Sequence, residues 1–114
     1  MNLKGKNIVV GVTAGIAAYK VCYVVSALKK AGAEVFVVMT ENATQFVRPL
    51  TFETLSGNRV IVDTFDRDFE WEVEHVSLAK KADLFLVAPC TADFAGKLAN
   101  GIADDFLSTT AMAM

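Results

Sequence analysis

The sequence predicts a three-layer α/β/α fold, in which helices cover both faces of a parallel β-sheet. Short apolar runs rich in β-branched residues alternate with stretches of helical periodicity, at residues 7–12, 34–39, 60–65 and 84–89. Strands buried on both faces of a parallel sheet have this continuous apolar pattern. Helices between consecutive strands imply right-handed crossovers and therefore parallel pairing. The 114 residues suffice for one domain at most, and we expect its sheet to be incomplete at the C-terminal side.

Each predicted element has its own sequence pattern and end signals. Pro fits the first turn of a helix, Gly fits the position after its end, and lysines fit its last turn. The expected elements of the first half are a strand at 7–12, a helix from Ala17 to Leu28 with Gly32 as C-cap, a strand at 34–39, a short helix from Thr40 to Phe46, and a helix between Pro49 and Gly57. Those of the second half are a strand at 60–65, a helical turn up to Ala82, a strand at 84–89, and helices from Thr91 and from about Asp104, where Asp104 and Asp105 are expected to cap the last helix.

Composition excludes several functional classes. Hydrophobic residues make up 54% of the chain, and a net charge of −2 without a basic stripe argues against a nucleic-acid partner. No apolar run approaches the roughly 18 residues of a membrane span, and the N-terminus lacks a signal-peptide pattern, so we expect a cytoplasmic protein that is not bound to membranes. Cys22 and Cys90 fit neither a disulfide framework nor a zinc spacing, and we interpret them as reduced thiols without a metal.

The expected topology brings two loops together. In a parallel sheet of this class, ligands bind at the carboxyl ends of the strands, where the winding direction reverses. With the strand order 3-2-1-4, the loop at 13–15 ("TAG") lies beside the loop at 88–93 ("APCTAD"). The turn within "GVTAGIAAYK" reads G-x-x-x-G, which is neither the dinucleotide pattern G-x-G-x-x-G nor a P-loop, because Lys20 is misplaced.

The loop chemistry favours a mononucleotide. A nicotinamide-binding fold usually ends its second strand in an acidic residue that binds a ribose hydroxyl, whereas "MTEN" places Thr40 there. A hydroxyl together with the N–H groups of a helix N-terminus suits a phosphate, which favours FMN. Two plainer interpretations stay open: Thr40 is only an N-cap, and Gly15 only forms a tight turn rather than allowing close approach of a ligand.

Three stretches carry a family resemblance: "GIAAYK", "EHVSLAKKADLFLVAPCTAD" and "KLANGIADDFLST". Together they resemble the flavin-containing cysteine decarboxylases (HFCD flavoproteins), most of all the N-terminal decarboxylase domain of the bifunctional phosphopantothenoylcysteine decarboxylase/phosphopantothenate–cysteine ligases. The resemblance implies a Rossmann-like (flavodoxin-like) fold, FMN as cofactor and a homo-oligomer, since relatives form trimers and dodecamers. The residues that match the family's flavin loops are Ala14, Gly15, Ile16, Thr40, Ala43, Pro89, Cys90, Thr91 and Ala92.

The resemblance assigns the chemistry to His75. It implies oxidative decarboxylation of 4'-phosphopantothenoylcysteine: the flavin accepts a hydride from the cysteinyl β-carbon, CO2 leaves the resulting thioaldehyde, and the returned electrons yield 4'-phosphopantetheine. His75 matches the catalytic histidine, as a base near the substrate thiol or as a group that orients it. Without the resemblance, a lone histidine is more often a structural or surface residue. Cys90 is expected to pack against the flavin ring rather than to act as a nucleophile.

Departures from the family pattern keep alternatives open. Many relatives have Asn at the position of Asp93, and the chain ends at "TTAMAM", before the family's P-x-M-N-x-x-M motif and flap cysteine. We therefore expect residues 1–114 to be the N-terminal part of an FMN-binding decarboxylase domain, inactive in isolation. A peptidyl-cysteine (lantibiotic-type) decarboxylase and a flavin-binding module without catalysis remain alternatives. A flavin prenyltransferase shares the fold, but "EHVSLAKKAD" does not suit it.

Overall fold

A parallel three-stranded sheet forms the centre of the molecule. The computed structural model describes residues 2–62 and 77–114. The strands β1 (Asn7–Val12), β2 (Glu34–Met39) and β3 (Leu84–Val87) pair in parallel in the order β2-β1-β3. The predicted strands at 7–12 and 34–39 are confirmed. The last predicted strand, at 84–89, ends at Val87 instead, although the Ala88 N–H still donates to the Gly11 carbonyl at 2.9 Å.

The third predicted strand, at 60–65, begins beside the outer edge of β2. Ile61 forms a parallel bridge with Val38: its carbonyl accepts from the Met39 N–H at 2.9 Å, and its own N–H donates to the Val37 carbonyl at 3.2 Å. In the expected 3-2-1-4 order, the numbers count the four predicted strands along the chain, and the predicted third strand lies beside the second. The contact of Ile61 with Val38 of β2 agrees with this order. The rest of this strand prediction, from residue 63 onward, lies outside the described residues.

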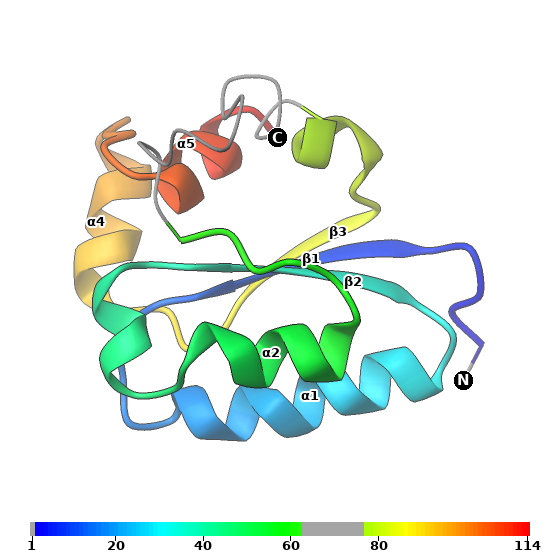
Figure 1. Cartoon of the computed structure of the whole chain (residues 1–114). Helices are drawn as coiled ribbons and strands as arrows, with labels where there is room; N and C mark the ends of the chain where they lie inside the picture. Colours follow the sequence, from blue (N-terminus) through cyan, green and yellow to red (C-terminus); the bar gives the residue numbers. More distant parts are fainter. Residues whose placement is uncertain (1, 63–76) are drawn as a thin grey trace.

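The helices lie in two layers, one on each face of the sheet (Figure 1). The helices α1 and α2 cover one face, and α4 and α5 lie on the opposite side together with a helical turn at 77–81. The bounds are α1 (Ala18–Lys30), η1 (Asn42–Gln45, a 3-10 helix), α2 (Pro49–Ser56), α4 (Ala92–Ala99) and α5 (Phe106–Met112). The predicted three-layer α/β/α class is therefore confirmed. Gly57 ends α2 at φ +75°, a left-handed conformation that glycine adopts without a steric penalty.

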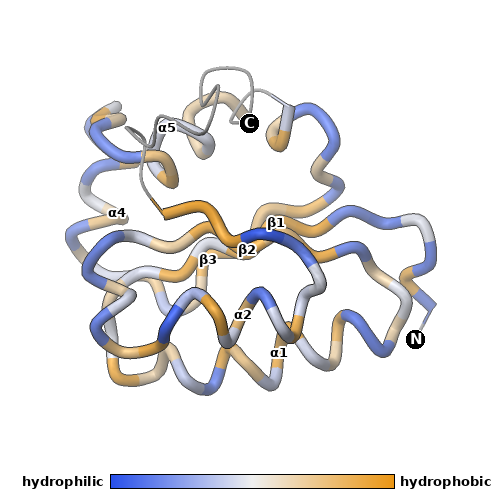
Figure 2. Tube along the Cα trace, viewed as in Figure 1, coloured by the Kyte–Doolittle hydropathy of each residue, from blue (hydrophilic) through white to orange (hydrophobic). Residues whose placement is uncertain are grey.

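Alternate residues of β1 point into two separate cores. Val10 packs in a cluster with Val25 of α1 and Phe52 of α2. Val9 belongs to the second cluster, with Phe94 of α4 and Leu107 of α5. Figure 2 shows this arrangement as apolar strands between helices of mixed polarity. Because side chains alternate along a strand, an apolar run such as β1 serves both cores.

Helix α5 approaches β1 closely at a glycine. A Cβ atom built on Gly11 would lie 2.6 Å from Cδ1 of Leu107, a side chain with no exposed surface. Gly11 therefore provides the space into which Leu107 packs. This contact fixes the position of α5, whose N-terminus borders the site described below.

No described helix is both long enough and apolar enough to cross a membrane.

Candidate functional site

The loops after β1 and β3 are joined by the side chain of Thr13. The Thr13 hydroxyl donates to the Pro89 carbonyl and accepts from the Thr91 N–H at 3.0 Å, and the Thr13 N–H donates to the same Pro89 carbonyl at 3.3 Å. Thr13 is 1% exposed. The predicted proximity of the two loops is therefore confirmed. We refer to residues 13–15 and 88–91 together as the cradle.

Gly15 fits the cradle because the ring of Pro89 lies against it. A Cβ atom on Gly15 would lie 3.3 Å from Cγ of Pro89, a contact tighter than most that real Cβ atoms make. Gly15 is not among the described glycines with positive φ, so a strained turn is not the reason for glycine here. A small residue is needed for the packing of one loop against the other.

Thr40 combines two of the roles considered from the sequence. Its hydroxyl accepts from the Ala43 N–H at 3.2 Å, which confirms its capping role at the short helix η1. The helix is shorter than predicted and has Glu41 as its N-cap residue. Thr40 also lines the cleft described next. A hydroxyl that accepts one hydrogen bond retains its proton for donation, so capping leaves Thr40 able to bind a ligand.

A cleft of about 420 Å³ lies at the carboxyl ends of the strands, between the segment that follows β2 and the N-terminal parts of α4 and α5. This volume is within the usual range for small-molecule sites. The lining residues are Thr13, Ala14, Thr40, Glu41, Asn42, Val62, Thr91, Asp93, Phe94, Lys97, Asp104 and Asp105. Ala14, Thr40 and Thr91 were predicted site residues, and the cleft brings them together.

The other predicted site residues lie around this cleft rather than among its lining residues. Ala43 is the buried residue of η1, and Pro89 packs on Gly15. The side chains of Ile16 and Cys90 are exposed, Ile16 at 82%, and Cys90 lies within 3.8 Å of the Thr91 carbonyl. Ala92 is exposed at the first position of α4. His75, together with the acidic stretch around it, falls outside the described residues.

Thr91 and Asp105 fix the beginnings of the two helices beside the cleft. The Thr91 hydroxyl accepts from the Phe94 N–H at 3.1 Å and caps α4. The Asp105 carboxylate accepts from the Ser108 N–H at 2.7 Å and from the Ser108 hydroxyl at 2.6 Å, and so caps α5. The prediction that Asp105 caps the last helix is confirmed. Asp104, for which the same role was considered, instead forms an ion pair with Lys97.

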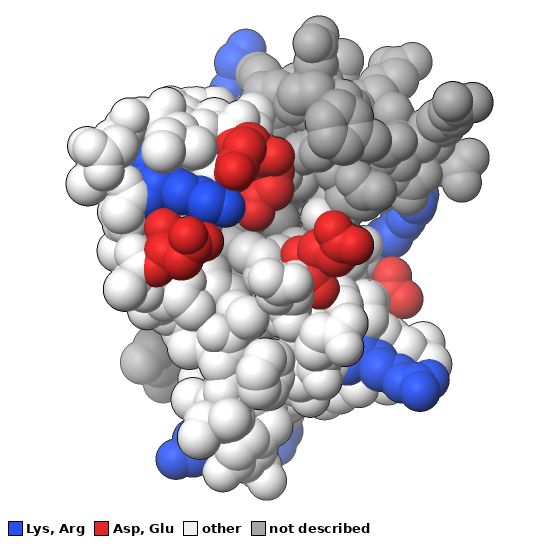
Figure 3. Space-filling model, turned by 90° about the vertical axis from the view of Figure 1, so that its left-hand side faces the viewer, with Lys and Arg blue, Asp and Glu red and all other residues white. Residues whose placement is uncertain are grey.

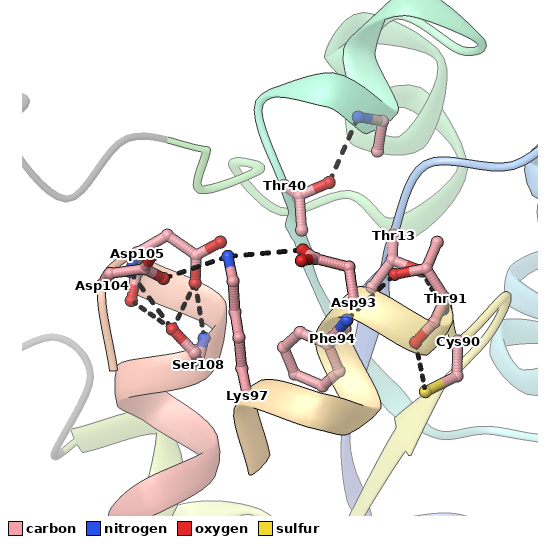
Figure 4. Close-up of polar contacts among 11 residues, drawn as sticks. Thr13, Thr40, Cys90, Thr91, Asp93, Phe94, Lys97, Asp104, Asp105 and Ser108 are labelled. Carbon is pink, nitrogen blue, oxygen red and sulfur yellow. Dashed lines mark hydrogen bonds and ion pairs between the residues drawn. The ribbon is translucent and has the colours of Figure 1, made fainter. Parts of the chain in front are cut away.

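Lys97 connects α4 to the segment before α5. Its Nζ lies 3.1 Å from Oδ1 of Asp104 and 3.6 Å from Oδ2 of Asp93 (Figure 4). The hydrogen bond to Asp104 is the main reason why the pKa of Lys97 is raised above its usual value, so the ammonium is charged at neutral pH. We call Asp93, Lys97, Asp104 and Asp105 the charged wall. Figure 3 shows acidic side chains gathered on this face of the molecule, with a basic side chain among them.

The sequence placed Thr13 in the candidate loop at 13–15 without giving it a role of its own, and it did not identify Lys97 as a site residue. Lys97 and Asp93 are four residues apart on one helix, a spacing that predicts an ion pair. The partner across the loop, Asp104, depends on how residues 100–104 turn, which no short-range pattern specifies. Thr13 followed the predicted strand directly, but a single threonine there gives no sign of a hydrogen bond to a loop 76 residues away.

Residues 1–114 match the model of the family described as Flavoprotein. The coenzyme A biosynthesis bifunctional protein CoaBC of Bacillus subtilis (strain 168) is 50% identical over 111 residues, which cover 97% of this chain and 27% of that protein. The chain therefore spans little more than a quarter of the length of the curated relatives it matches. Two solved structures of proteins described as FMN-dependent cysteine decarboxylases are similar to this chain. SpaF has a TM-score of 0.86 at 31% identity, with 97% of this chain and 64% of SpaF covered. TvaF, from thioviridamide biosynthesis, has a TM-score of 0.88 at 28% identity, with 96% and 67% covered.

Proposed function

Because the chain belongs to the Flavoprotein family, we propose that it forms the N-terminal, FMN-binding part of a decarboxylase domain. The whole protein would convert 4'-phosphopantothenoylcysteine to 4'-phosphopantetheine in coenzyme A biosynthesis, in the cytoplasm. The observation that carries the proposal is the cleft beside the cradle, at the carboxyl ends of parallel strands. The names of the curated relatives, bifunctional coenzyme A biosynthesis proteins, supply the pathway.

The residues at the cleft fit a flavin mononucleotide. Glycine at position 15 lets the ring of Pro89 pack closely on its loop, and we propose that the flavin meets mainly backbone and small residues there. The hydroxyls of Thr40 and Thr91 line the cleft and suit a phosphate or ribityl group. We propose that FMN is held by the full predicted set: Ala14, Gly15, Ile16, Thr40, Ala43, Pro89, Cys90, Thr91 and Ala92.

The bound flavin would supply the hydride acceptor of the reaction. The protein's own contribution is to hold the ring and the phosphate at fixed positions, with Thr13 keeping the two loops together. We assign His75 to the substrate thiol, as a base that takes up its proton or as a group that orients the thiol. A His75→Asn substitution in the full-length protein should keep the flavin bound and abolish CO2 release.

We also propose that the protein is a homo-oligomer, a trimer or a dodecamer. Large apolar side chains are exposed on α1 and two residues before it, at the helical spacing of Ile16, Tyr19 and Tyr23, with exposures of 82%, 54% and 74%. Leu50 on the neighbouring helix α2 is 68% exposed. Exposed apolar residues in such number favour contact with another copy of the chain. A Tyr23→Glu substitution should lower the mass measured by light scattering.

A peptidyl-cysteine decarboxylase is the second candidate. It is favoured by the structural neighbours SpaF and TvaF, which are described as FMN-dependent cysteine decarboxylases. The two functions differ in the acyl part of the substrate, a phosphopantothenoyl group or a peptide. Higher identity to the coenzyme A proteins supports the first.

One experiment tests both parts of the proposal. The purified full-length protein is denatured, the released flavin is identified by mass, and CO2 release is measured with 4'-phosphopantothenoylcysteine and with a peptide ending in cysteine. We expect FMN and release from the phosphopantothenoyl substrate alone. Release from the peptide alone would establish the second candidate, and FMN without CO2 release from either substrate would leave a binding module.

A further inference from the structure

The loop between α4 and α5 begins with an Asn-Gly pair. Asn100 is followed by Gly101, and no other asparagine of the chain is followed by glycine. Asn100 is exposed at the C-cap of α4, and Gly101 has a left-handed φ of +69°. A side chain on the residue after an asparagine hinders attack of that residue's backbone nitrogen on the asparagine amide, and glycine has none. At this pair the backbone can therefore react with a side-chain amide more readily than elsewhere in the chain.

The reaction at such a pair needs only water. The backbone nitrogen of Gly101 gives up its proton and forms a bond to Cγ of Asn100, while the bond from Cγ to Nδ2 breaks and the nitrogen leaves as ammonia, having taken up a proton. Water then opens the cyclic imide. Opening at Cγ gives an aspartate at position 100. Opening at the main-chain carbonyl gives an isoaspartate, whose backbone runs through Cβ and Cγ.

The backbone nitrogen of Gly101 is only weakly held. Its N–H donates to the Leu98 carbonyl at 3.4 Å, longer than the ordinary range of roughly 2.7–3.2 Å. The next N–H along the chain, that of Ile102, donates to the Lys97 carbonyl at 2.9 Å. Because the last turn of a helix frays and opens locally, a long hydrogen bond at this place gives the nitrogen of Gly101 little protection.

The side chain of Asn100 closes the end of α4. Its Nδ2 donates to the Gly96 carbonyl at 2.8 Å, and the same carbonyl accepts from the Asn100 N–H at 3.1 Å. An ionised carboxylate cannot donate the first of these bonds. It also adds negative charge at a helix C-terminus, where the helix dipole disfavours it. The turn at 100–104 leads to Asp104 of the charged wall, so a change at the end of α4 bears on the border of the cleft.

We propose that Asn100 is a deamidation site, with Gly101 supplying the attacking nitrogen, and that its conversion weakens the C-terminal end of α4. The modification accumulates with the age of the protein, so that old molecules carry an additional carboxylate next to the charged wall. The inference does not depend on the proposed function, because it involves neither a flavin nor a decarboxylation.

The first test follows the modification itself. The purified full-length protein is incubated at mildly alkaline pH, and conversion of single asparagines is measured by peptide mass spectrometry. Asn42 is the matched control, because it is also exposed but is followed by Ala43. We expect conversion at Asn100 to be at least about tenfold faster than at Asn42, with both aspartate and isoaspartate as products. Comparable rates at the two positions would overturn the assignment.

The second test measures the structural consequence. Asn100→Asp introduces the carboxylate directly, and we expect a lower midpoint of thermal unfolding, followed by circular dichroism. Asn42→Asp is the control, since it adds the same charge at the first residue of η1 rather than at a helix C-terminus, and it should not lower the midpoint. An unchanged midpoint in Asn100→Asp, or an equal fall in both variants, would overturn the proposed weakening of α4.

Discussion

The cradle and the charged wall border the same cleft but are held together in different ways. The cradle depends on the buried Thr13, whose hydroxyl and N–H bond to two residues of the opposite loop. The wall depends on ion pairs whose carboxylates face water. Buried hydrogen bonds are costly to break, whereas exposed ion pairs contribute little to stability. The cradle should therefore contribute to the stability of the fold and fix the shape of the cleft. The charged wall should mainly set the electrostatic field in the cleft.

The largest expected effect is that of Thr13→Val, which breaks the cradle. The Thr91 N–H loses its acceptor, and the hydroxyl bond to the Pro89 carbonyl is lost in a site that is 1% exposed. We expect the free energy of unfolding, measured in urea, to fall by about 2–3 kcal/mol. Thr54→Val is the control, because the Thr54 hydroxyl bonds to the Leu50 carbonyl on an exposed helix surface. An equal loss in both variants would mean that the Thr13 hydrogen bonds stabilise the fold no more than an exposed hydrogen bond does.

Gly11→Ala tests how tightly α5 packs against β1. The new Cβ would lie 2.6 Å from Cδ1 of Leu107, so this side chain must shift within a packed core. We expect a loss of roughly 1–3 kcal/mol in the free energy of unfolding. Gly96→Ala, where an added Cβ meets nothing within 4 Å, should instead stabilise α4. If Gly11→Ala is neutral, α5 moves more freely than its buried position indicates.

Asp105→Ala removes the N-cap of α5. Its carboxylate accepts from both the N–H and the hydroxyl of Ser108. Loss of an N-cap of this kind costs about 1 kcal/mol, which thermal unfolding followed by circular dichroism would detect. Asp105→Asn keeps the acceptor and serves as the control. If the two variants lose the same stability, the charge matters more than the cap.

The smallest expected effect is that of the Lys97 ion pairs on stability. The pKa of Lys97 is raised in the folded state, mainly by its hydrogen bond to Asp104. A raised pKa means that the charged form stabilises the fold below the unfolded pKa of about 10.4 and that this contribution disappears as the pH rises through the folded pKa. Lys97→Met should therefore cost at most about 1 kcal/mol near neutrality. The difference from the unsubstituted protein should shrink as urea unfolding is measured at increasing pH above about 10.4.

The sequence predicted the cradle better than it predicted the wall. The strands at 7–12 and 34–39 follow from continuous apolar runs, and once their order is inferred, the loops that follow β1 and β3 must meet. Thr91 and Asp105 are capping residues that local rules identify. The pairing of Lys97 with Asp104 follows only from the path of the loop between α4 and α5, which depends on the tertiary packing of α5 through Leu107.

The hydrogen bonds of Thr13 also bear on the kinetics of ligand association. They hold the loops after β1 and β3 together without any contribution from a ligand. A ligand that enters the cleft therefore does not have to order these loops first. Its association should follow a single exponential whose rate rises in proportion to ligand concentration, without the plateau that a preceding conformational step produces. In Thr13→Val the loops become separately mobile, and such a plateau should appear.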